Sequence, residues 1–325
     1  MNHIFGPVNS RRLGRSLGVD LFQEKICTLN CIYCEVGATT RLTCERAEYV
    51  PTADILREID EFCSHPGRVE ELDYVTITAS GEPTLHSGFG EILAHLHRVT
   101  AKPVAVLTNG TTLSDSQVRR ELLPADVVIP SLDSALPESF RRIDRAANCL
   151  DLDEIIEGLV LFSHEYAGKL WLEILFSQGI NDSERDVKAL RQVAGRMRID
   201  RIQLNTVARP PLESFSRPLA RERLLEIADQ FRHDDPLRPV DLLATGAQQE
   251  DPEGAQQKFD LAKSADRKAL LAEIVDMLKR RPCTAADINR TFHLGSSDKV
   301  EQLLAPLVKE GTVQQRFHGN RLYYQ

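Results

Sequence analysis

The sequence lacks several features that define whole classes of protein. No apolar run approaches the ~18 residues that a membrane-spanning helix requires, so we expect no contact with a membrane. The N-terminal segment has no apolar core followed by a small-residue cleavage site, and it does not resemble a secretory signal. Seven cysteines in 325 residues are too few and too clustered for a disulfide framework. We therefore expect a cytoplasmic protein.

The overall composition excludes further classes. Hydrophobic residues make up 42% and charged residues 27% of the chain, a balance that allows a large buried core. A collagenous, coiled-coil or wholly disordered chain is therefore excluded. Asp and Glu number 48 against 40 Lys and Arg. This net acidity argues against a general nucleic-acid coat and leaves room for a local basic patch.

Short runs rich in β-branched residues alternate with longer amphipathic stretches over residues 18–243. The expected strands are Val19–Phe22, Tyr74–Thr78, Val104–Leu107, Val127–Pro130, Leu170–Phe176 and Arg201–Asn205. Three segments carry signals for the start of a helix: Pro51-Thr52, Ser114-Asp115-Ser116-Gln117 and Asn181-Asp182-Ser183. Six strand–helix repeats predict an α/β fold with a parallel sheet, either open or a partial barrel. Its chemistry should lie at the carboxyl ends of the strands.

A change of composition divides the chain. Residues 244–257 contain no aromatic or bulky aliphatic residue, which predicts a linker. We expect a catalytic domain over 1–243, a linker over 244–262 and a small domain over 263–325. The small domain should contain three helices, the second capped by Thr284 and the third by Ser296 or Ser297. A hairpin that turns at His318-Gly319-Asn320 should follow. This order resembles a winged-helix domain.

The charge of the C-terminal segment leaves its partner open. Residues 261–325 hold 11 Lys and Arg against 7 Asp and Glu, so tRNA or another RNA is a candidate partner. Arg316 and Arg321 on the hairpin are the best-placed cations. The third helix carries Asp298, Glu301 and Glu310, a poor composition for contacting phosphates. Such domains also bind peptides or pack against a catalytic domain.

Three cysteines are the most informative feature of the chain. Cys27, Cys31 and Cys34 form a CX3CX2C pattern, and three thiolates on one short loop can hold three corners of an iron–sulfur cluster. A structural zinc or [4Fe–4S] site normally takes four ligands. The missing fourth ligand would leave one metal open to a substrate. The alternative is a closed structural site completed by Cys44 or Cys63.

The CX3CX2C pattern, with Tyr33 before its last cysteine, resembles the radical S-adenosylmethionine (SAM) superfamily. Three further motifs follow in the family's order at expected strand ends: Ala79-Ser80-Gly81-Glu82-Pro83, Leu107-Thr108-Asn109-Gly110 and Ser131-Leu132-Asp133. The first is similar to the family's Gly-Gly-Glu-Pro motif, with Ser80 in place of the first glycine. Because serine is small, we expect this substitution to matter little. The resemblance covers roughly residues 5–211.

The resemblance implies a fold, cofactors and site residues. The fold is a partial (β/α)6 barrel followed by the winged-helix-like domain, and the cofactors are SAM and a [4Fe–4S] cluster on the three cysteines. Reduction of the cluster would cleave SAM to methionine and a 5′-deoxyadenosyl radical that abstracts hydrogen from a substrate. The enzyme would be oxygen-sensitive and need a low-potential electron donor such as a ferredoxin or flavodoxin. The implied SAM contacts are Tyr33 at the adenine, Gly81, Glu82 and Pro83 at the amino group, and Ser131 with Asp133 or Asn109 at the ribose.

A looser resemblance narrows the branch. The segment Gly6–Gly18, with Leu85, Ile180–Asp182 and Gln203–Thr206, is similar to proteins grouped with the tRNA wyosine synthases. Those synthases carry a second cluster on upstream cysteines, and this chain has no cysteine before Cys27. We therefore take tRNA or another RNA as the first substrate hypothesis, and a peptide or small metabolite as the second. An iron–sulfur redox sensor with a DNA-binding winged helix is disfavoured, because a sensor needs no SAM motifs.

Several polar residues have two interpretations. One arginine group is Arg11, Arg12 and Arg15, and the other is Arg141, Arg142 and Arg145. Each group would bind the SAM carboxylate, a phosphate or an acidic substrate, or form surface ion pairs, and we favour Arg145 as a site residue. Glu173 and Asn205 should point into the barrel, where a strand-end ion pair would also explain the carboxylate. His293, His318 and Cys283 are expected to be structural.

Overall fold

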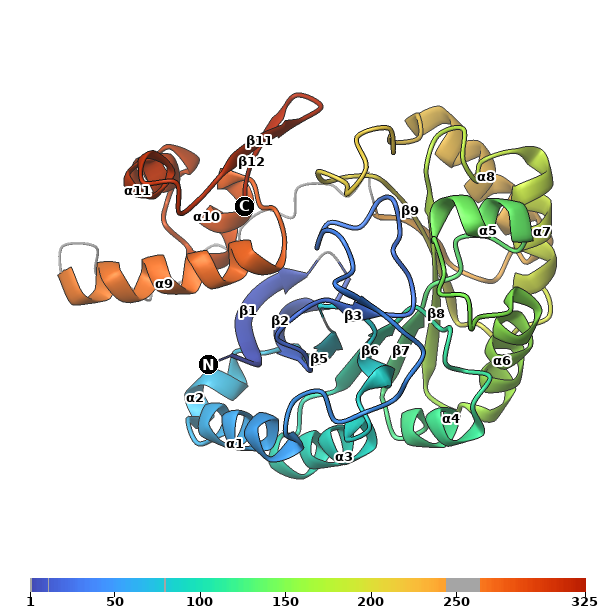
Figure 1. Cartoon of the computed structure of the whole chain (residues 1–325), viewed down its shortest axis with the longest axis horizontal. Helices are drawn as coiled ribbons and strands as arrows, with labels where there is room; N and C mark the ends of the chain where they lie inside the picture. The colour runs from blue at the N-terminus through green and yellow to red at the C-terminus, as the bar shows by residue number, and fades with distance from the viewer. Residues whose placement is uncertain (1, 11, 79, 244–263) are drawn as a thin grey trace.

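The structure is a computed structural model, and it describes residues 2–10, 12–78, 80–243 and 264–325 (Figure 1). Arg11 and the predicted linker over 244–262 therefore lie outside the described residues. No helix in these ranges is long and apolar enough to span a membrane.

One curved sheet organises the larger part of the chain, in the order β1-β2-β5-β6-β7-β8-β9-β10. The strands are β1 (Ile4–Ser10), β2 (Gly14–Asp20), β5 (Tyr74–Thr78), β6 (Val104–Thr108), β7 (Val127–Pro130), β8 (Lys169–Phe176), β9 (Arg201–Thr206) and β10 (Val240–Leu242). β1 pairs antiparallel with β2, and every other neighbouring pair is parallel. The predicted α/β class and its six parallel strands are confirmed.

The sheet also has two strands that the pattern did not predict. β1 lies at one edge and contains Gly6 and Pro7, which hide its strand character, and β10 at the other edge has only three residues. The first predicted strand is also placed too late, because β2 already begins at Gly14. A separate parallel pair, β3 (Ile26–Cys27) and β4 (Arg41–Leu42), bounds residues 26–42, the cysteine loop.

Helices cover the outer side of the sheet (Figure 1). They are α1 (Thr52–Cys63), α2 (Pro66–Glu70), the 3₁₀ turn η1 (Pro83–Leu85), α3 (Phe89–Val99), α4 (Ser116–Leu122), α5 (Pro137–Ile143), α6 (Leu152–Glu165), α7 (Glu184–Ala194) and α8 (Arg221–Asp234). Ser183 caps α7 as predicted, because its side chain accepts a hydrogen bond from the Asp186 amide. The expected cap of α4 is wrong by one residue, because the Asp115 carboxylate, not Ser114, accepts the Gln117 amide.

The core lies between the sheet and these helices. Ile55 and Ile59 of α1, one turn apart, are buried in the same hydrophobic cluster as β-branched residues of the strands, such as Val19 and Ile77. Complete burial of one such side chain stabilises the fold by about 1.5–3 kcal/mol. The core therefore fixes the strands whose carboxyl ends carry the sequence motifs.

The C-terminal unit, residues 264–325, has its own hydrophobic core. It consists of α9 (Ser264–Arg280), α10 (Ala285–Phe292), α11 (Ser297–Lys309), β11 (Gln315–His318) and β12 (Arg321–Tyr324). Thr284 caps α10 in a capping box with Asp287, and Ser296 caps α11. The predicted order of three helices and an antiparallel hairpin is confirmed.

The C-terminal unit packs beside the edge strand β1 (Figure 1). The Asn9 side-chain amide donates to the Arg290 carbonyl over 2.9 Å. On the other side, the Tyr323 hydroxyl donates to the carbonyl of Ala208, just after β9, over 2.8 Å. The unit thus contacts both the first strand of the sheet and the loop after β9.

Candidate functional site

The cysteine loop leads out of the sheet at its carboxyl end. Cys27 and Cys31 line a cavity of about 180 Å³, together with residues at the ends of β5, β6 and β7 and with Glu173 in the middle of β8. Cys34 is not among the lining residues, and the Lys25 ammonium lies 2.9 Å from its sulfur. Burial raises the pKa of the Cys27 thiol to about 12 and also raises the pKa of Cys31, because a desolvated thiolate is costly without a cation.

The donor set fits an iron–sulfur cluster better than a single metal ion. Within the described ranges, no three side chains from His, Cys, Asp and Glu converge on one ion position. A cluster needs no such convergence, because each thiolate binds a different iron atom. Three free thiols on a loop of eight residues, Cys27 buried and Cys31 and Cys34 partly buried, therefore suit three corners of a cluster.

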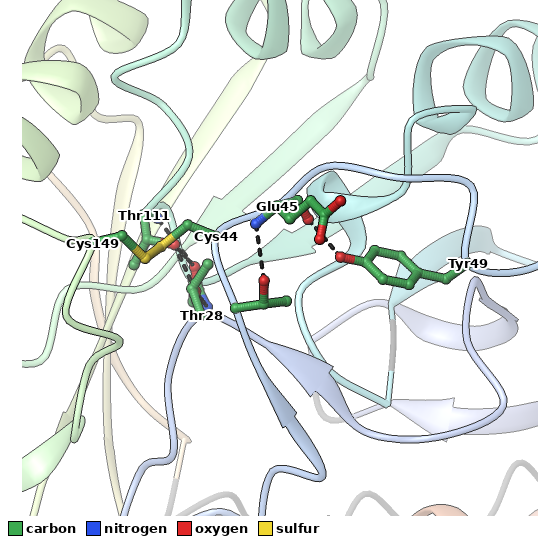
Figure 2. Close-up of a disulfide and its surroundings, with 8 residues drawn as sticks. Thr28, Cys44, Glu45, Tyr49, Thr111 and Cys149 are labelled. Carbon is green, nitrogen blue, oxygen red and sulfur yellow. Dashed lines mark hydrogen bonds between the residues drawn. A yellow bond between two sulfur atoms is a disulfide. The ribbon is translucent and has the colours of Figure 1, made fainter.

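The alternative of a closed four-cysteine site is not supported. Cys44 forms a disulfide with Cys149 (Figure 2), and Cys63 is the last residue of α1, where it packs against the hydrophobic core. This single disulfide was not predicted from the sequence, which excluded only a disulfide framework. The two cysteines are 105 positions apart, and only the fold brings their Cα atoms to 6.5 Å.

The disulfide adds to a set of hydrogen bonds that hold the cysteine loop. The backbone amides of Asn30 and Ile32 donate to the carbonyls of Asp144 and Ile143, each over 2.9 Å. The hydroxyls of Thr28 and Thr111, drawn in Figure 2, lie 2.7 Å apart. The loop is thus held on two sides by contacts that do not use the thiols of Cys27, Cys31 and Cys34.

Gly81 sits where only glycine fits. Its φ is +140°, and a Cβ there would lie 1.8 Å from the Ile26 carbonyl oxygen. The close approach allows two backbone hydrogen bonds, from the Ile26 amide to the Ser80 carbonyl (3.1 Å) and from the Glu82 amide to the Ile26 carbonyl (2.9 Å). The segment 80–83 is therefore fixed directly against the residue before Cys27.

The Glu82 carboxylate is buried and fully engaged by its own chain. One oxygen accepts from the Thr84 amide (3.1 Å), the Thr84 hydroxyl (2.6 Å) and the Thr108 hydroxyl (2.7 Å). The other accepts from the Asn109 amide over 2.6 Å. Burial raises its pKa, and these donors oppose the rise. The carboxylate thus connects the ends of β5 and β6.

Asn109 faces the cysteine loop. Its side-chain NH₂ lies 3.5 Å from the Cys27 sulfur and 2.8 Å from the Thr28 hydroxyl. Its side-chain oxygen accepts from both the amide and the hydroxyl of Thr111. An N–H donor beside a cluster thiolate is one of the groups that set the reduction potential of an iron–sulfur cluster.

Tyr33, Ser131 and Asp133 all line the cavity. The Tyr33 hydroxyl donates to one Asp133 oxygen, and the Leu175 amide donates to the other over 2.7 Å. Burial raises the pKa of Asp133 to about 7. No hydrogen bond from the described residues reaches the Ser131 hydroxyl, so it is free to bind a ligand.

Asp144 is a site residue that the sequence did not reveal. Its carboxylate lines the cavity and accepts from the Cys31 thiol over 3.5 Å. Burial and the nearby Asp133 carboxylate raise its pKa. No motif contains this residue, and its only signal was its place beside Arg145, which we favoured instead.

The barrel interior holds a polar cluster. Arg12 and the cavity residue Glu173 form an ion pair of 2.5 Å, and the Asn205 amide donates to the same carboxylate over 3.1 Å. Gln203, buried on the same strand as Asn205, lies 3.5 Å from Arg12. The prediction that Glu173 and Asn205 point inward is confirmed, and Arg12 supplies the ion pair.

Several predicted residues do not reach the cavity. Arg145 pairs with Glu213 at 2.5 Å, and Arg15 pairs with Glu71 at 2.7 Å near the surface. The Arg142 side chain donates to the Gly179 carbonyl. Pro83 is buried in η1 beside the cavity without lining it.

Comparisons with known proteins agree with this geometry. The model of the radical SAM superfamily matches residues 25–191. A UPF0026 protein of Synechocystis is 37% identical over 220 residues, 67% of this chain and 78% of that protein. A Brachyspira hyodysenteriae protein named GTPase Obg is 31% identical over 321 residues, 99% of this chain but only 45% of that protein.

A solved structure shows the same fold. TYW1 with a lysine–pyruvate adduct bound is 19% identical, covers 70% of this chain and 76% of its own, and superposes with a TM-score of 0.52. This match confirms the expected partial barrel, and the family's cofactors are SAM and a [4Fe–4S] cluster. With its cysteine pattern and motifs gathered on one cavity, the chain belongs to the radical SAM superfamily of enzymes, in the group of UPF0026 proteins.

Proposed function

We propose that this enzyme holds its [4Fe–4S] cluster on Cys27, Cys31 and Cys34 and abstracts a hydrogen atom from an RNA substrate. The observation that carries the site is the single cavity shared by two of these cysteines and the ends of β5, β6 and β7. When bound, the cluster supplies a low-potential electron and SAM supplies the 5′-deoxyadenosyl radical. A ferredoxin or flavodoxin is the proposed electron donor.

The hydrogen-bond pattern supports different proposed tasks for the motif residues. Because the Glu82 carboxylate already accepts four hydrogen bonds from its own chain, the backbone carbonyl of Gly81 is the better acceptor for the SAM amino group. No hydrogen bond from the described residues reaches the Gly81 carbonyl. The free Ser131 hydroxyl suits the ribose, and Tyr33, fixed by Asp133, suits the adenine. Glu82 and Asn109 then act as supports.

RNA is favoured by the outer surface of the hairpin. Phe317 is 74% exposed; it follows Arg316 in the sequence, and its paired residue, Leu322, follows Arg321. An exposed aromatic ring with neighbouring arginines suits an unstacked base and its phosphates. The cluster of Arg12, Glu173 and Asn205 offers donors and acceptors to a base that enters the barrel. No lysine lines the cavity among the described residues, so we do not carry over the adduct named for TYW1.

We also propose the domain division 1–243, 244–262 and 263–325, with a winged helix at the end. The two separate hydrophobic cores support this division. The 220 matched residues of the Synechocystis protein are close in length to the proposed catalytic domain. The Brachyspira protein matches 99% of this chain, so both parts recur together there.

The chemistry is tested on the anaerobic protein reconstituted with iron and sulfide. With SAM and dithionite, we expect 5′-deoxyadenosine from the wild type and from Cys63→Ala. We expect none from Cys31→Ala, which lacks a cluster ligand. A fully loaded wild type that forms no 5′-deoxyadenosine would contradict the proposed chemistry.

The substrate class is tested separately by binding. Fluorescence anisotropy with bulk tRNA should show salt-dependent binding that weakens at least fivefold in Phe317→Ala and in Arg316→Ala/Arg321→Ala. Leu237→Ala, at another exposed apolar side chain, is the matched control. Binding of equal strength in every variant would reject the hairpin as an RNA surface.

A further inference from the structure

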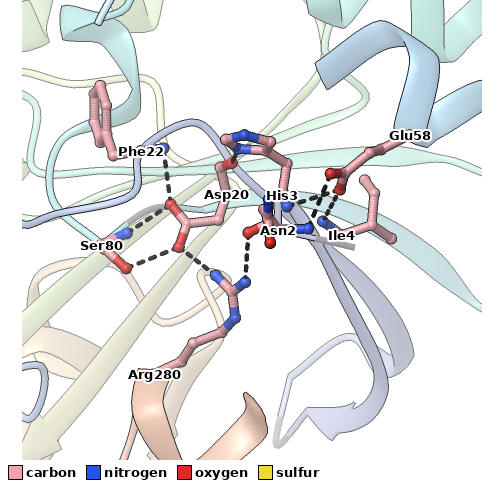
Figure 3. A network of polar contacts seen from close by, with 8 residues as sticks. All are labelled: Asn2, His3, Ile4, Asp20, Phe22, Glu58, Ser80 and Arg280. Atoms are coloured by element: carbon pink, nitrogen blue, oxygen red, sulfur yellow. Dashed lines mark hydrogen bonds and ion pairs between the residues drawn. The ribbon is translucent and has the colours of Figure 1, made fainter. Parts of the chain in front are cut away.

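A buried carboxylate connects the C-terminal unit to the segment 80–83. Asp20 ends β2, and its side chain is only 3% exposed (Figure 3). One oxygen accepts from the amides of Phe22 (3.2 Å) and Ser80 (2.9 Å). The other accepts from the Ser80 hydroxyl over 2.7 Å and from Arg280 over 2.5 Å. Arg280 is the last residue of α9.

The Arg280 guanidinium is held in place by three separate contacts. Besides Asp20, it donates to the Asn2 carbonyl over 2.9 Å, and its central carbon lies 4.4 Å from the centre of the Phe5 ring. The side chain is 19% exposed. A charge-assisted bond in so sheltered a place is stronger than a surface ion pair, and Lys could not reproduce its forked geometry.

The connection continues from Ser80 to the cluster. The Ser80 carbonyl accepts the Ile26 amide over 3.1 Å, and Ile26 precedes Cys27. Gly81, next to Ser80, presents the carbonyl proposed for the SAM amino group. A short series of hydrogen bonds therefore joins α9, Asp20, Ser80 and the start of the cysteine loop.

We propose that Arg280 is a positioning residue for SAM, and that the C-terminal unit is thereby part of the SAM-binding apparatus. This inference rests on the proposed role of the segment 80–83. Without Arg280, the Asp20 carboxylate would remain buried without its countercharge and would no longer hold Ser80 in one place. By linkage, a partner that moves the C-terminal unit would change the affinity for SAM.

The inference also explains why serine stands where the family has glycine. The Ser80 hydroxyl provides the side-chain bond to Asp20, which glycine could not make. Our expectation that this substitution matters little does not take the bond into account. Ser80 and Arg280 bind the same oxygen of Asp20 from opposite parts of the chain.

The test measures SAM binding to the full-length, cluster-loaded protein by anaerobic equilibrium dialysis. We expect Arg280→Met to weaken SAM binding about tenfold, with unchanged iron content and with kcat at saturating SAM within twofold of the wild type. Lys279→Met, on the same turn of α9, removes a charge that is 69% exposed and pairs with Asp276. It should bind SAM like the wild type.

A double-mutant cycle tests the route through Asp20. If Arg280 acts through this carboxylate, adding Arg280→Met to Asp20→Asn should weaken SAM binding by less than twofold further. Full additivity, or wild-type affinity in Arg280→Met, would overturn the inference. If Arg280→Met does not load its cluster, Arg280→Lys is measured in its place. We expect Arg280→Lys to bind SAM about threefold more weakly than the wild type. Wild-type affinity for SAM in Arg280→Lys would overturn the inference. A loaded wild type that does not bind SAM would instead reject the proposed function.

Discussion

The cysteine loop and the C-terminal unit are attached to the sheet in different ways. The loop is held by backbone hydrogen bonds to Ser80, Ile143 and Asp144 and by the Cys44–Cys149 disulfide. The polar contacts of the C-terminal unit come mainly from single side chains, above all Arg280 and Tyr323. Backbone contacts depend on chain geometry, whereas side-chain contacts are lost with one substitution. The cysteine loop should therefore be most sensitive to substitution of its glycine contact and its cysteines. The C-terminal unit should be most sensitive to substitution of a few polar residues.

The strongest test of this difference is Gly81→Ala. The new Cβ would collide with the Ile26 carbonyl, and the residue would keep an unfavourable positive φ. We expect SAM binding to fall more than a hundredfold and the free energy of unfolding to fall by about 2–4 kcal/mol. Dialysis and urea titration measure the two effects. Gly179→Ala has a φ of +72° with nothing within 4 Å of its Cβ, and should cost only about 1 kcal/mol.

Removal of the disulfide tests the covalent attachment of the loop. In oxidised protein, Cys149→Ser should lower the free energy of unfolding by about 2–4 kcal/mol, because the bond closes a loop of 105 residues. Under strong reductant the wild type and the variant should unfold alike. Equal stability under oxidising conditions would show that the two cysteines are not joined.

Ser131→Ala tests a single contact with the ligand. The hydroxyl has no partner among the described residues, so its loss should leave the free energy of unfolding within about 0.5 kcal/mol. If it binds the ribose, the KM for SAM should rise about fivefold to tenfold. An unchanged KM in the 5′-deoxyadenosine assay would remove Ser131 from the site.

The smallest effect is expected at the hairpin. Tyr323→Phe deletes the hydrogen bond to Ala208 and should cost about 0.5–1.5 kcal/mol of unfolding free energy. SAM affinity should stay within twofold of the wild type, because this contact does not reach the segment 80–83. A loss as large as that in Arg280→Met would mean that the whole interface, not Asp20, acts on the site.

The sequence predicted what is local or belongs to a motif. The strands Tyr74–Thr78 and Val127–Pro130 have the predicted bounds, because short buried β-branched runs are strong signals. The three motifs meet at one cavity because parallel strands end at one edge of the sheet.

Contacts between distant residues left no such signal. Asp20 and Arg280 are 260 positions apart, and Cys44 and Cys149 are 105 apart. Neither pair has a spacing or periodicity that would reveal it. Asp144 likewise becomes a site residue only when the loop after α5 folds against the cysteine loop.

We propose above all that Cys27, Cys31 and Cys34 hold a cluster with one iron open to SAM. Electron paramagnetic resonance of the dithionite-reduced protein, recorded with and without SAM, tests it most directly. We expect a [4Fe–4S] signal that changes shape when SAM binds, and a much smaller change at the same SAM concentration in Gly81→Ala. A fully loaded wild-type cluster with an identical signal in both samples would contradict it.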